Sequence, residues 1–133
     1  MKKTGILNSD ISRVLSYMGH TDCLCIGDCG LPFPDEVERI DLALKLGVPS
    51  FMETLRTVKE DMKIEAIVLA EEIKEKNPQV LAEIEELFSE DKPEVTFVPH
   101  IEFKERTRGC KAIVRTGETT PYANIILQSA CLF

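Results

Sequence analysis

The chain has 133 residues, of which 44% are hydrophobic and 29% are charged, the size and apolar content of one globular domain over residues 1–133. Its 16 Lys and Arg against 23 Asp and Glu give a formal net charge of −7, which argues against nucleic acid or an anionic membrane as a partner. No stretch approaches the roughly 20 apolar residues of a membrane span, and the first residues lack the apolar core of a secretory signal. We therefore expect a cytoplasmic protein. An odd number of cysteines, five, also argues against a disulfide scaffold.

The first half of the chain alternates helical and strand patterns. Asn8 has the chemistry of a helix cap, and the helix behind it is expected to end at Gly19, with apolar positions at Ile11, Val14, Leu15 and Met18. Residues 23–26 form a short apolar strand, and the glycines and prolines of residues 27–34 predict a shaped loop. Residues 39–44 are expected to form a strand, residues 51–62 a helix, and residues 66–69 a buried strand.

The second half continues the alternation. Asn77 followed by Pro78 predicts the start of an amphipathic helix that runs to residue 88. Residues 95–98 and 112–114 resemble short strands with a helix at 102–108 between them, and residues 124–133 are expected to form a strand to the end. Because continuously apolar strands must be covered on both faces, the pattern predicts an α/β fold, layered, with a mainly parallel central sheet flanked by helices.

Ligands of such sheets bind in the loops that follow the carboxyl ends of the strands. This rule selects the loop at Asp28, the Pro99-His100 junction and the segment of residues 116–124.

Only two histidines occur, and both lie at predicted element junctions. His20 follows the first helix, where a cation near the helix carboxyl end is a purely structural alternative to a general acid or base. His100 follows a strand, where a solvated or capping loop residue is the structural alternative. The residue types allow acid/base chemistry near neutral pH, and their spacing alone does not choose between the two interpretations.

Asp28 stands directly after the first apolar strand, between Gly27 and Gly30. A dinucleotide-binding protein places glycines here for a pyrophosphate, but a carboxylate repels phosphate and instead accepts hydrogen bonds from hydroxyl groups. This favours a neutral sugar or polyol, against the alternative of an Asp that only forms a turn with its own backbone. Tyr122 and Asn124 lie in a Gly- and Pro-containing turn and offer a flat ring with a hydroxyl and an amide, which suit a sugar ring; a plain β-turn is the alternative.

Two further clusters carry weaker signals. His20 with Cys23, Cys25 and Cys29 could be considered for zinc, but the spacing is not that of a zinc knuckle and buried cysteines are the simpler interpretation. We therefore expect no metal site. A basic segment could meet a phosphate, but a solvated helix face or salt bridges to an acidic neighbouring subunit explain it better. It comprises Lys104, Arg106, Arg108, Lys111 and Arg115.

Three separated motifs resemble the D-ribose pyranase family, the relatives of the fucose mutarotases. They are Gly19-His20-Thr21-Asp22, then Asp28 with Gly30-Leu31-Pro32 and Pro34, and finally Arg115-Thr116-Gly117-Glu118 followed by residues 120–124. The resemblance runs from Met1 to Phe133 and so covers essentially the whole chain. Cys29 departs from it, since a small alanine is more usual there, and this could slightly reshape the pocket.

The resemblance implies that His20 is the proton donor and that Asp28, His100 and the turn Tyr122-Ala123-Asn124 hold the sugar. It also implies a cytoplasmic homodecamer of two stacked pentamers, with the site near subunit boundaries. The implied reaction, interconversion of pyranose and furanose ribose, needs only proton transfers, so no cofactor is expected. A fucose-type mutarotase and a non-catalytic sugar-binding module remain as alternatives.

Overall fold

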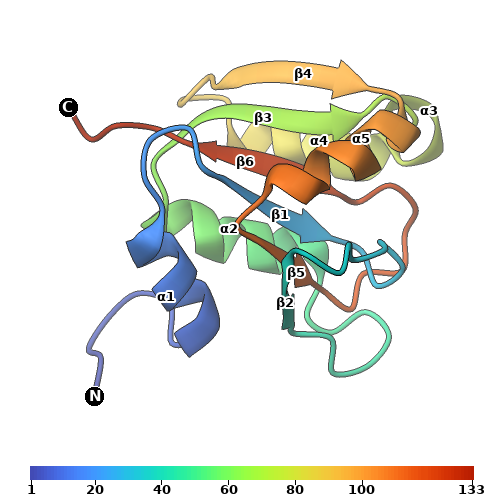
Figure 1. Cartoon of the computed structure of the whole chain (residues 1–133). Helices are drawn as coiled ribbons and strands as arrows, with labels where there is room; N and C mark the ends of the chain where they lie inside the picture. Colours follow the sequence, from blue (N-terminus) through green and yellow to red (C-terminus); the bar gives the residue numbers. More distant parts are fainter.

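The computed structural model describes residues 1–133, which form a six-stranded sheet covered by helices on both faces (Figure 1). In chain order the elements are α1 (Ser9–Tyr17), β1 (Cys23–Gly27), β2 (Glu38–Asp41), α2 (Phe51–Asp61), β3 (Ile64–Ala70), α3 (Ile73–Lys76), α4 (Pro78–Leu87), β4 (Glu94–Val98), α5 (His100–Arg106), the 3₁₀ turn η1 (Thr107–Gly109), β5 (Ala112–Arg115) and β6 (Ile125–Ser129). None of the helices has both the length and the apolar character needed to cross a membrane.

The strands are ordered β2-β5-β1-β6-β3-β4. β1, β2 and β5 pair in parallel, as do β3 and β4, and only β6 runs antiparallel to its neighbours β1 and β3. In Figure 1 the arrow of β6 therefore points against those of β1, β3 and β4. The predicted α/β fold with a mainly parallel sheet is confirmed, and β6 joins its two parallel halves.

Side chains capping the helices explain where three of them begin. The Asn8 side chain accepts a hydrogen bond from the Ile11 N–H at 2.9 Å. The Asn77 side chain accepts from the Val80 N–H at 3.4 Å, with Pro78 in the first helical turn. Both caps were predicted from sequence, and Ser50 caps α2 in the same way. Each bond satisfies a backbone donor that the helix itself leaves free.

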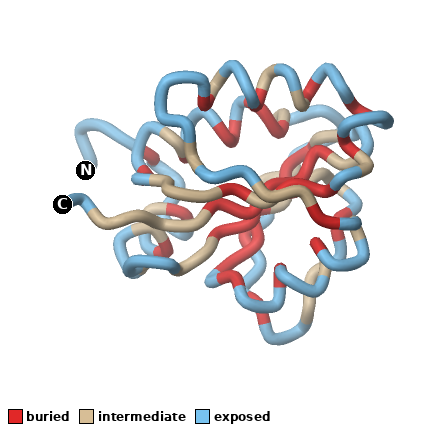
Figure 2. The backbone as a smooth tube through the Cα atoms, turned by 90° about the horizontal axis from the view of Figure 1, so that it is seen from above, coloured by how far each residue is buried: buried red, intermediate tan, exposed pale blue.

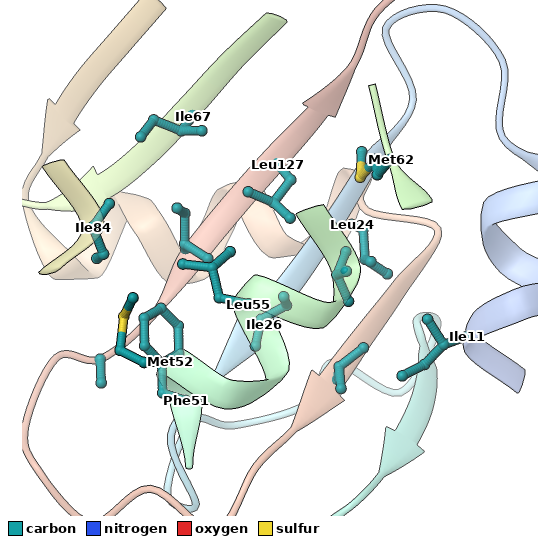
Figure 3. Close-up of a cluster of buried hydrophobic side chains, with 14 of the residues drawn as sticks. Ile11, Leu24, Ile26, Phe51, Met52, Leu55, Met62, Ile67, Ile84 and Leu127 are labelled. Atoms are coloured by element: carbon teal, nitrogen blue, oxygen red, sulfur yellow. The ribbon is translucent and has the colours of Figure 1, made fainter. Parts of the chain in front are cut away.

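Alternate residues of the central strands face opposite layers of the core. On one side, Leu24 and Ile26 of β1 and Leu127 of β6 pack against Phe51 and Leu55 of α2 (Figure 3). On the other side, the intervening strand residues pack with Phe103 of α5; they include Cys25, Ile113 and Ile126. Viewed from above, the buried residues gather along the middle of the sheet, between exposed outer surfaces of the helices (Figure 2). Burial on both faces explains the continuously apolar strands.

Several predicted boundaries are wrong. The strand expected at residues 39–44 is β2, Glu38–Asp41, and the chain then enters a loop in which Leu44 is exposed. The terminal strand ends at Ser129, leaving Leu132 and Phe133 exposed rather than paired. The helix expected at residues 102–108 begins earlier, at His100, and continues into η1. The short helix α3 has no counterpart in the sequence prediction.

Candidate active site

Asp28 and Asn124 face each other where β1 ends and β6 begins. The Asp28 N–H donates to Asn124 Oδ1 at 2.9 Å, and Asn124 Nδ2 donates back to Asp28 Oδ2 at 3.0 Å. A third bond, from the Gly30 N–H to Asp28 Oδ1 at 2.9 Å, fixes the other carboxylate oxygen. Asn124 is only 1% exposed, whereas Asp28 is half-buried. The pair holds a carboxylate in one orientation at the surface, where its remaining lone pairs can accept hydroxyl groups.

Gly27 makes room for this pair. A Cβ at Gly27 would lie 3.0 Å from Asn124 Oδ1 and 2.7 Å from a methyl carbon of Leu31. The Thr116 hydroxyl also donates to the Gly27 carbonyl at 2.8 Å, which ties the end of β1 to the chain leaving β5. The glycine is therefore needed for close packing at the site rather than for a phosphate.

The turn before β6 brings an aromatic ring against His100. Tyr122 has the left-handed backbone angle φ = 58°, and its carbonyl accepts the Asn124 N–H at 2.9 Å. Its ring meets the His100 imidazole edge to face, with centroids 5.0 Å apart and planes at 87°. Ala123, which lies between Tyr122 and Asn124 in the chain, is fully buried. The resemblance groups Tyr122, Ala123 and Asn124 with His100, and in the structure these residues do lie together.

His100 is the first residue of α5, and its surroundings favour a neutral imidazole. Its backbone N–H donates to both Glu72 carboxylate oxygens, at 3.0 and 3.1 Å, and its ring stacks on Phe103. Burial, and then the nearby Lys104 charge, lower the pKa of His100, although Glu72 and Asp28 oppose the shift. Nδ1 is buried and has no hydrogen-bond partner within the chain. A neutral imidazole that makes no ring hydrogen bond within the chain, and that lies close enough to Asp28 to feel its charge, is suited to a ligand hydroxyl.

Asn77 and Glu118 support the turn before β6, a role that the sequence did not predict for either. Asn77 Nδ2 donates to Thr120 Oγ1 and to the Pro121 carbonyl, both at 2.9 Å. Glu118 accepts the Thr120 N–H and the Phe51 N–H at the start of α2, both at 3.2 Å. Burial alone would raise the pKa of Glu118, but these backbone donors outweigh it and lower the pKa. Together the two side chains hold the turn against the starts of α4 and α2, and no local pattern indicates these bonds because their partners lie far apart in the chain.

His20 lies at the opposite edge of the sheet, in the turn that enters β1. Thr21 has φ = 70°, an unusual conformation for a β-branched residue, and its N–H donates to the Ser129 carbonyl at 3.0 Å. The Ser129 N–H donates to the Asp22 carbonyl at 2.9 Å, and Asp22 Oδ2 accepts the Gly19 N–H at 2.9 Å. The turn is thus fastened to the end of β6. The left-handed residue after α1 is Thr21, not Gly19 as a glycine-terminated helix would have it.

The structure does not bring His20 to the other five candidates within one chain. β1 contains five residues, and at about 3.3 Å a residue roughly 16 Å of strand separates its two ends. Asp28, His100 and residues 122–124 share one edge, at the carboxyl ends of the parallel strands, as the strand rule predicts. The His20 side chain is 50% exposed at the other edge, with Nε2 3.0 Å from Glu65 Oε2.

The two weaker clusters do not form sites. No group of three or more His, Cys, Asp and Glu side chains is arranged to hold a metal ion, and burial raises the pKa of the Cys25 and Cys110 thiols, that of Cys110 to about 12. Four of the five basic residues form ion pairs within the chain, Arg106 with Glu102, Arg108 with Glu36 and Glu105, Lys111 with Asp22, and Arg115 with Asp41. Salt bridges therefore do account for most of the basic segment, but within the chain.

Comparison with known proteins places the chain in a family. The model of the RbsD / FucU transport protein family matches residues 1–132. The chain is 53% identical to a D-ribose pyranase of Clostridium perfringens and 54% identical to one of Bacillus cytotoxicus, over 100% of each chain.

Solved structures agree. Bacillus subtilis RbsD in complex with D-ribose matches over 100% of both chains, with 49% identity and a TM-score of 0.96. A fucose mutarotase from Streptococcus pneumoniae, in complex with L-fucose, shares the fold at a TM-score of 0.76 and 23% identity, over 96% of this chain and 95% of that one. The family resemblance drawn from the three sequence motifs is confirmed: the chain belongs to the RbsD / FucU family.

Proposed function

We propose that the protein is a D-ribose pyranase, which interconverts the pyranose and furanose forms of D-ribose. The observation that carries the proposal is full-length identity of 53% to D-ribose pyranases, joined to a site whose groups suit hydroxyls. Asp28 presents a fixed carboxylate, and the half-buried His100 ring lies at the same edge of the sheet with Nδ1 unpartnered within the chain. These groups match a neutral sugar better than an anion, because a carboxylate repels phosphate.

The reaction breaks the hemiacetal, turns the open aldehyde, and closes it with another hydroxyl. Opening the pyranose requires a proton on the ring oxygen and loss of the proton from the anomeric hydroxyl. Closing to the furanose lets the C4 hydroxyl attack the aldehyde, with the reverse proton transfers. A positioned imidazole contributes roughly 10² to 10⁴-fold to such a step. The reaction therefore asks for placed proton donors and acceptors and for no redox chemistry.

His20 is the proposed proton donor to the ring oxygen. Asp28, His100, Tyr122 and Asn124 orient the hydroxyls, with Ala123 holding the turn between the last two. The fixed Asp28 carboxylate and the neutral His100 imidazole are the groups placed to receive the second proton. Their proximity within one chain supports this assignment.

The separation of His20 from this group supports a site shared by two copies of the chain. Because the two parts lie on opposite edges of one sheet, we infer a head-to-tail contact between copies, and repetition of such a contact forms a ring when its rotation closes. A cytoplasmic decamer of two stacked pentamers is the assembly we propose. Exposed Tyr17 at the His20 edge and Leu44, Leu46 and Ile101 in loops and in α5 are available for contacts between copies.

NMR magnetisation exchange on D-ribose tests the function, with the separate anomeric signals of pyranose and furanose followed directly. The native protein is expected to accelerate their exchange, and His20→Ala is expected to abolish the acceleration. If D-ribose is unaffected and L-fucose anomers exchange faster, the protein is a fucose-type mutarotase. Saturable binding without faster exchange of either sugar would leave a sugar-binding module.

A further inference from the structure

The His20 imidazole has one carboxylate partner in the chain. Nε2 lies 3.0 and 3.1 Å from the two oxygens of Glu65. Hydrogen bonds from Gln128 and then from His20 lower the pKa of Glu65, so this carboxyl is ionised near neutral pH. An ionised carboxylate only accepts hydrogen bonds, so Nε2 carries the proton in this contact. The second ring nitrogen, Nδ1, is left free.

Glu65 stands at an irregularity in the sheet. In the pairing of β3 with β6, Ile64 is opposite Ser129 and Ala66 is opposite Gln128. Two steps along β3 thus match one step along β6, and Glu65 is the extra residue of a β-bulge. Bulges turn a side chain away from its regular direction and are frequent beside active sites. At this bulge the Glu65 side chain takes a direction that regular strand pairing would not give it.

Gln128 holds the carboxylate in place. Its Nε2 donates to Glu65 Oε1 at 2.7 Å. The same strand also fastens the turn that carries His20, through the paired bonds between Ser129 and the backbone of Thr21 and Asp22. β6 therefore fixes both partners of the His20–Glu65 contact, one through its backbone and the other through a side chain.

We propose that Glu65, braced by Gln128, is a positioning residue for His20: it holds Nε2–H and thereby presents Nδ1 to the sugar. The proposal rests on the proposed function, in which His20 delivers the proton: the imidazolium gives the proton on Nδ1 to the ring oxygen, while the proton on Nε2 stays in the bond to Glu65. An imidazole 50% exposed on a turn would otherwise rotate about its side-chain bonds, and a proton donor works only within hydrogen-bond reach of its target. Carboxylate orientation of a catalytic histidine is a general device.

The test compares Glu65→Ala, Glu65→Gln and a control, Glu94→Ala, in the assembled protein. Glu94 begins the neighbouring strand β4 beside Ala66 and is exposed, so its removal matches the loss of charge at this edge. Glu65→Ala is expected to lower the maximal rate of ribose ring exchange roughly tenfold, with ribose affinity unchanged within about twofold. Glu65→Gln keeps a carbonyl acceptor for Nε2–H, so we expect it to retain most of the native exchange rate. Glu94→Ala is expected to retain the full native rate.

A second measurement, without sugar, separates this proposal from the proposed function. With ¹³C-labelled histidine, His20→Ala identifies which of the two imidazole signals is His20, and relaxation then reports the motion of its ring. The ring is expected to be ordered in the native protein, Glu65→Gln and Glu94→Ala, and mobile in Glu65→Ala. Equal ring order in Glu65→Ala and the native protein overturns the proposal, as does a Glu65→Gln rate as low as that of Glu65→Ala. If the native protein fails to accelerate ribose exchange, the proposed function fails while ring order still decides the contact.

Discussion

At the scale of single residues, Asn124 is the buried side chain on which the orientation of Asp28 depends. Both ends of its amide are used by Asp28, so Asn124→Ala leaves the half-buried Asp28 N–H without an acceptor and Asp28 Oδ2 without its donor, while Oδ1 keeps the Gly30 N–H. We expect a loss of roughly 1–3 kcal/mol in the free energy of unfolding and a clear loss of ribose affinity. Urea denaturation and calorimetric titration with D-ribose measure the two effects.

A matched asparagine supplies the control. Asn8 caps α1 on another part of the molecule, and Asn8→Ala should cost about 1 kcal/mol of stability without changing ribose affinity. Equal loss of affinity in both variants would mean that stability, and not the Asp28 contact, governs binding.

His100 gives a prediction for pH. Burial and Lys104 place its folded-state pKa below the ordinary histidine value of 6.5, so the unfolded chain binds the proton more readily than the folded one. The free energy of unfolding should therefore fall as pH drops from above 6.5 through the lower folded pKa, and this contribution is constant above that window. Denaturant unfolding at several pH values should show that the free energy of unfolding falls more steeply at acid pH for the native chain than for His100→Gln. Parallel curves would contradict the desolvation of His100.

At the scale of elements, Gly117 lets the loop after β2 lie against the loop after β5. A Cβ there would stand 2.5 Å from both the backbone nitrogen and the backbone oxygen of Val48. Backbone atoms cannot move aside without disturbing both loops, so Gly117→Ala should destabilise the fold by about 2 kcal/mol or more. Gly109→Ala is the control, because a Cβ at Gly109 meets nothing within 4 Å. Thermal unfolding should show a lower Tm for Gly117→Ala alone, and an equal shift in both variants would refute the steric argument.

The sequence predicted those elements whose signals are local. Asn8 and the Asn77-Pro78 pair act through bonds to residues three positions away, so their helices could be placed correctly. The insertion of β6 between β1 and β3 depends instead on pairings across the whole chain, and no short pattern encodes it. The same reason explains why Glu118 was missed, since it joins α2 to a turn 67 positions away.

Of the site, the part at one sheet edge followed from the rule for strand ends, and the position of His20 did not. His20 and Asp28 are close in sequence, yet an extended strand between them carries them to opposite edges. Residues that are close in sequence can lie far apart when a strand separates them, because an extended strand covers more distance per residue than any other regular backbone conformation.

At the scale of the whole molecule, the shared site predicts recovery of activity on mixing. Assemblies co-expressed from His20→Ala and Asp28→Ala chains contain some sites with a native His20 from one copy and a native Asp28 from the next. If the two chains assort at random, about a quarter of the sites are intact, and ribose exchange should return to roughly that fraction. Each variant expressed alone should remain inactive.

If His20 and Asp28 of the same chain formed one site, every mixed assembly would lack a complete site and no activity would return. Light scattering on the purified protein checks the premise, since a monomer would rule out any site between copies.

The place of β6 also has a consequence for the order in which the protein is made. Five strands leave the ribosome first, and they form two separate parallel sets, β1 with β2 and β5, and β3 with β4. In the folded sheet neither set pairs with the other, and only β6, the sixth strand in chain order, joins them. Asn124 and the anchors of the His20 turn arrive with that strand. A nascent chain that has not yet supplied β6 therefore carries neither half of the sugar site in its final form, and premature termination leaves no partly active product.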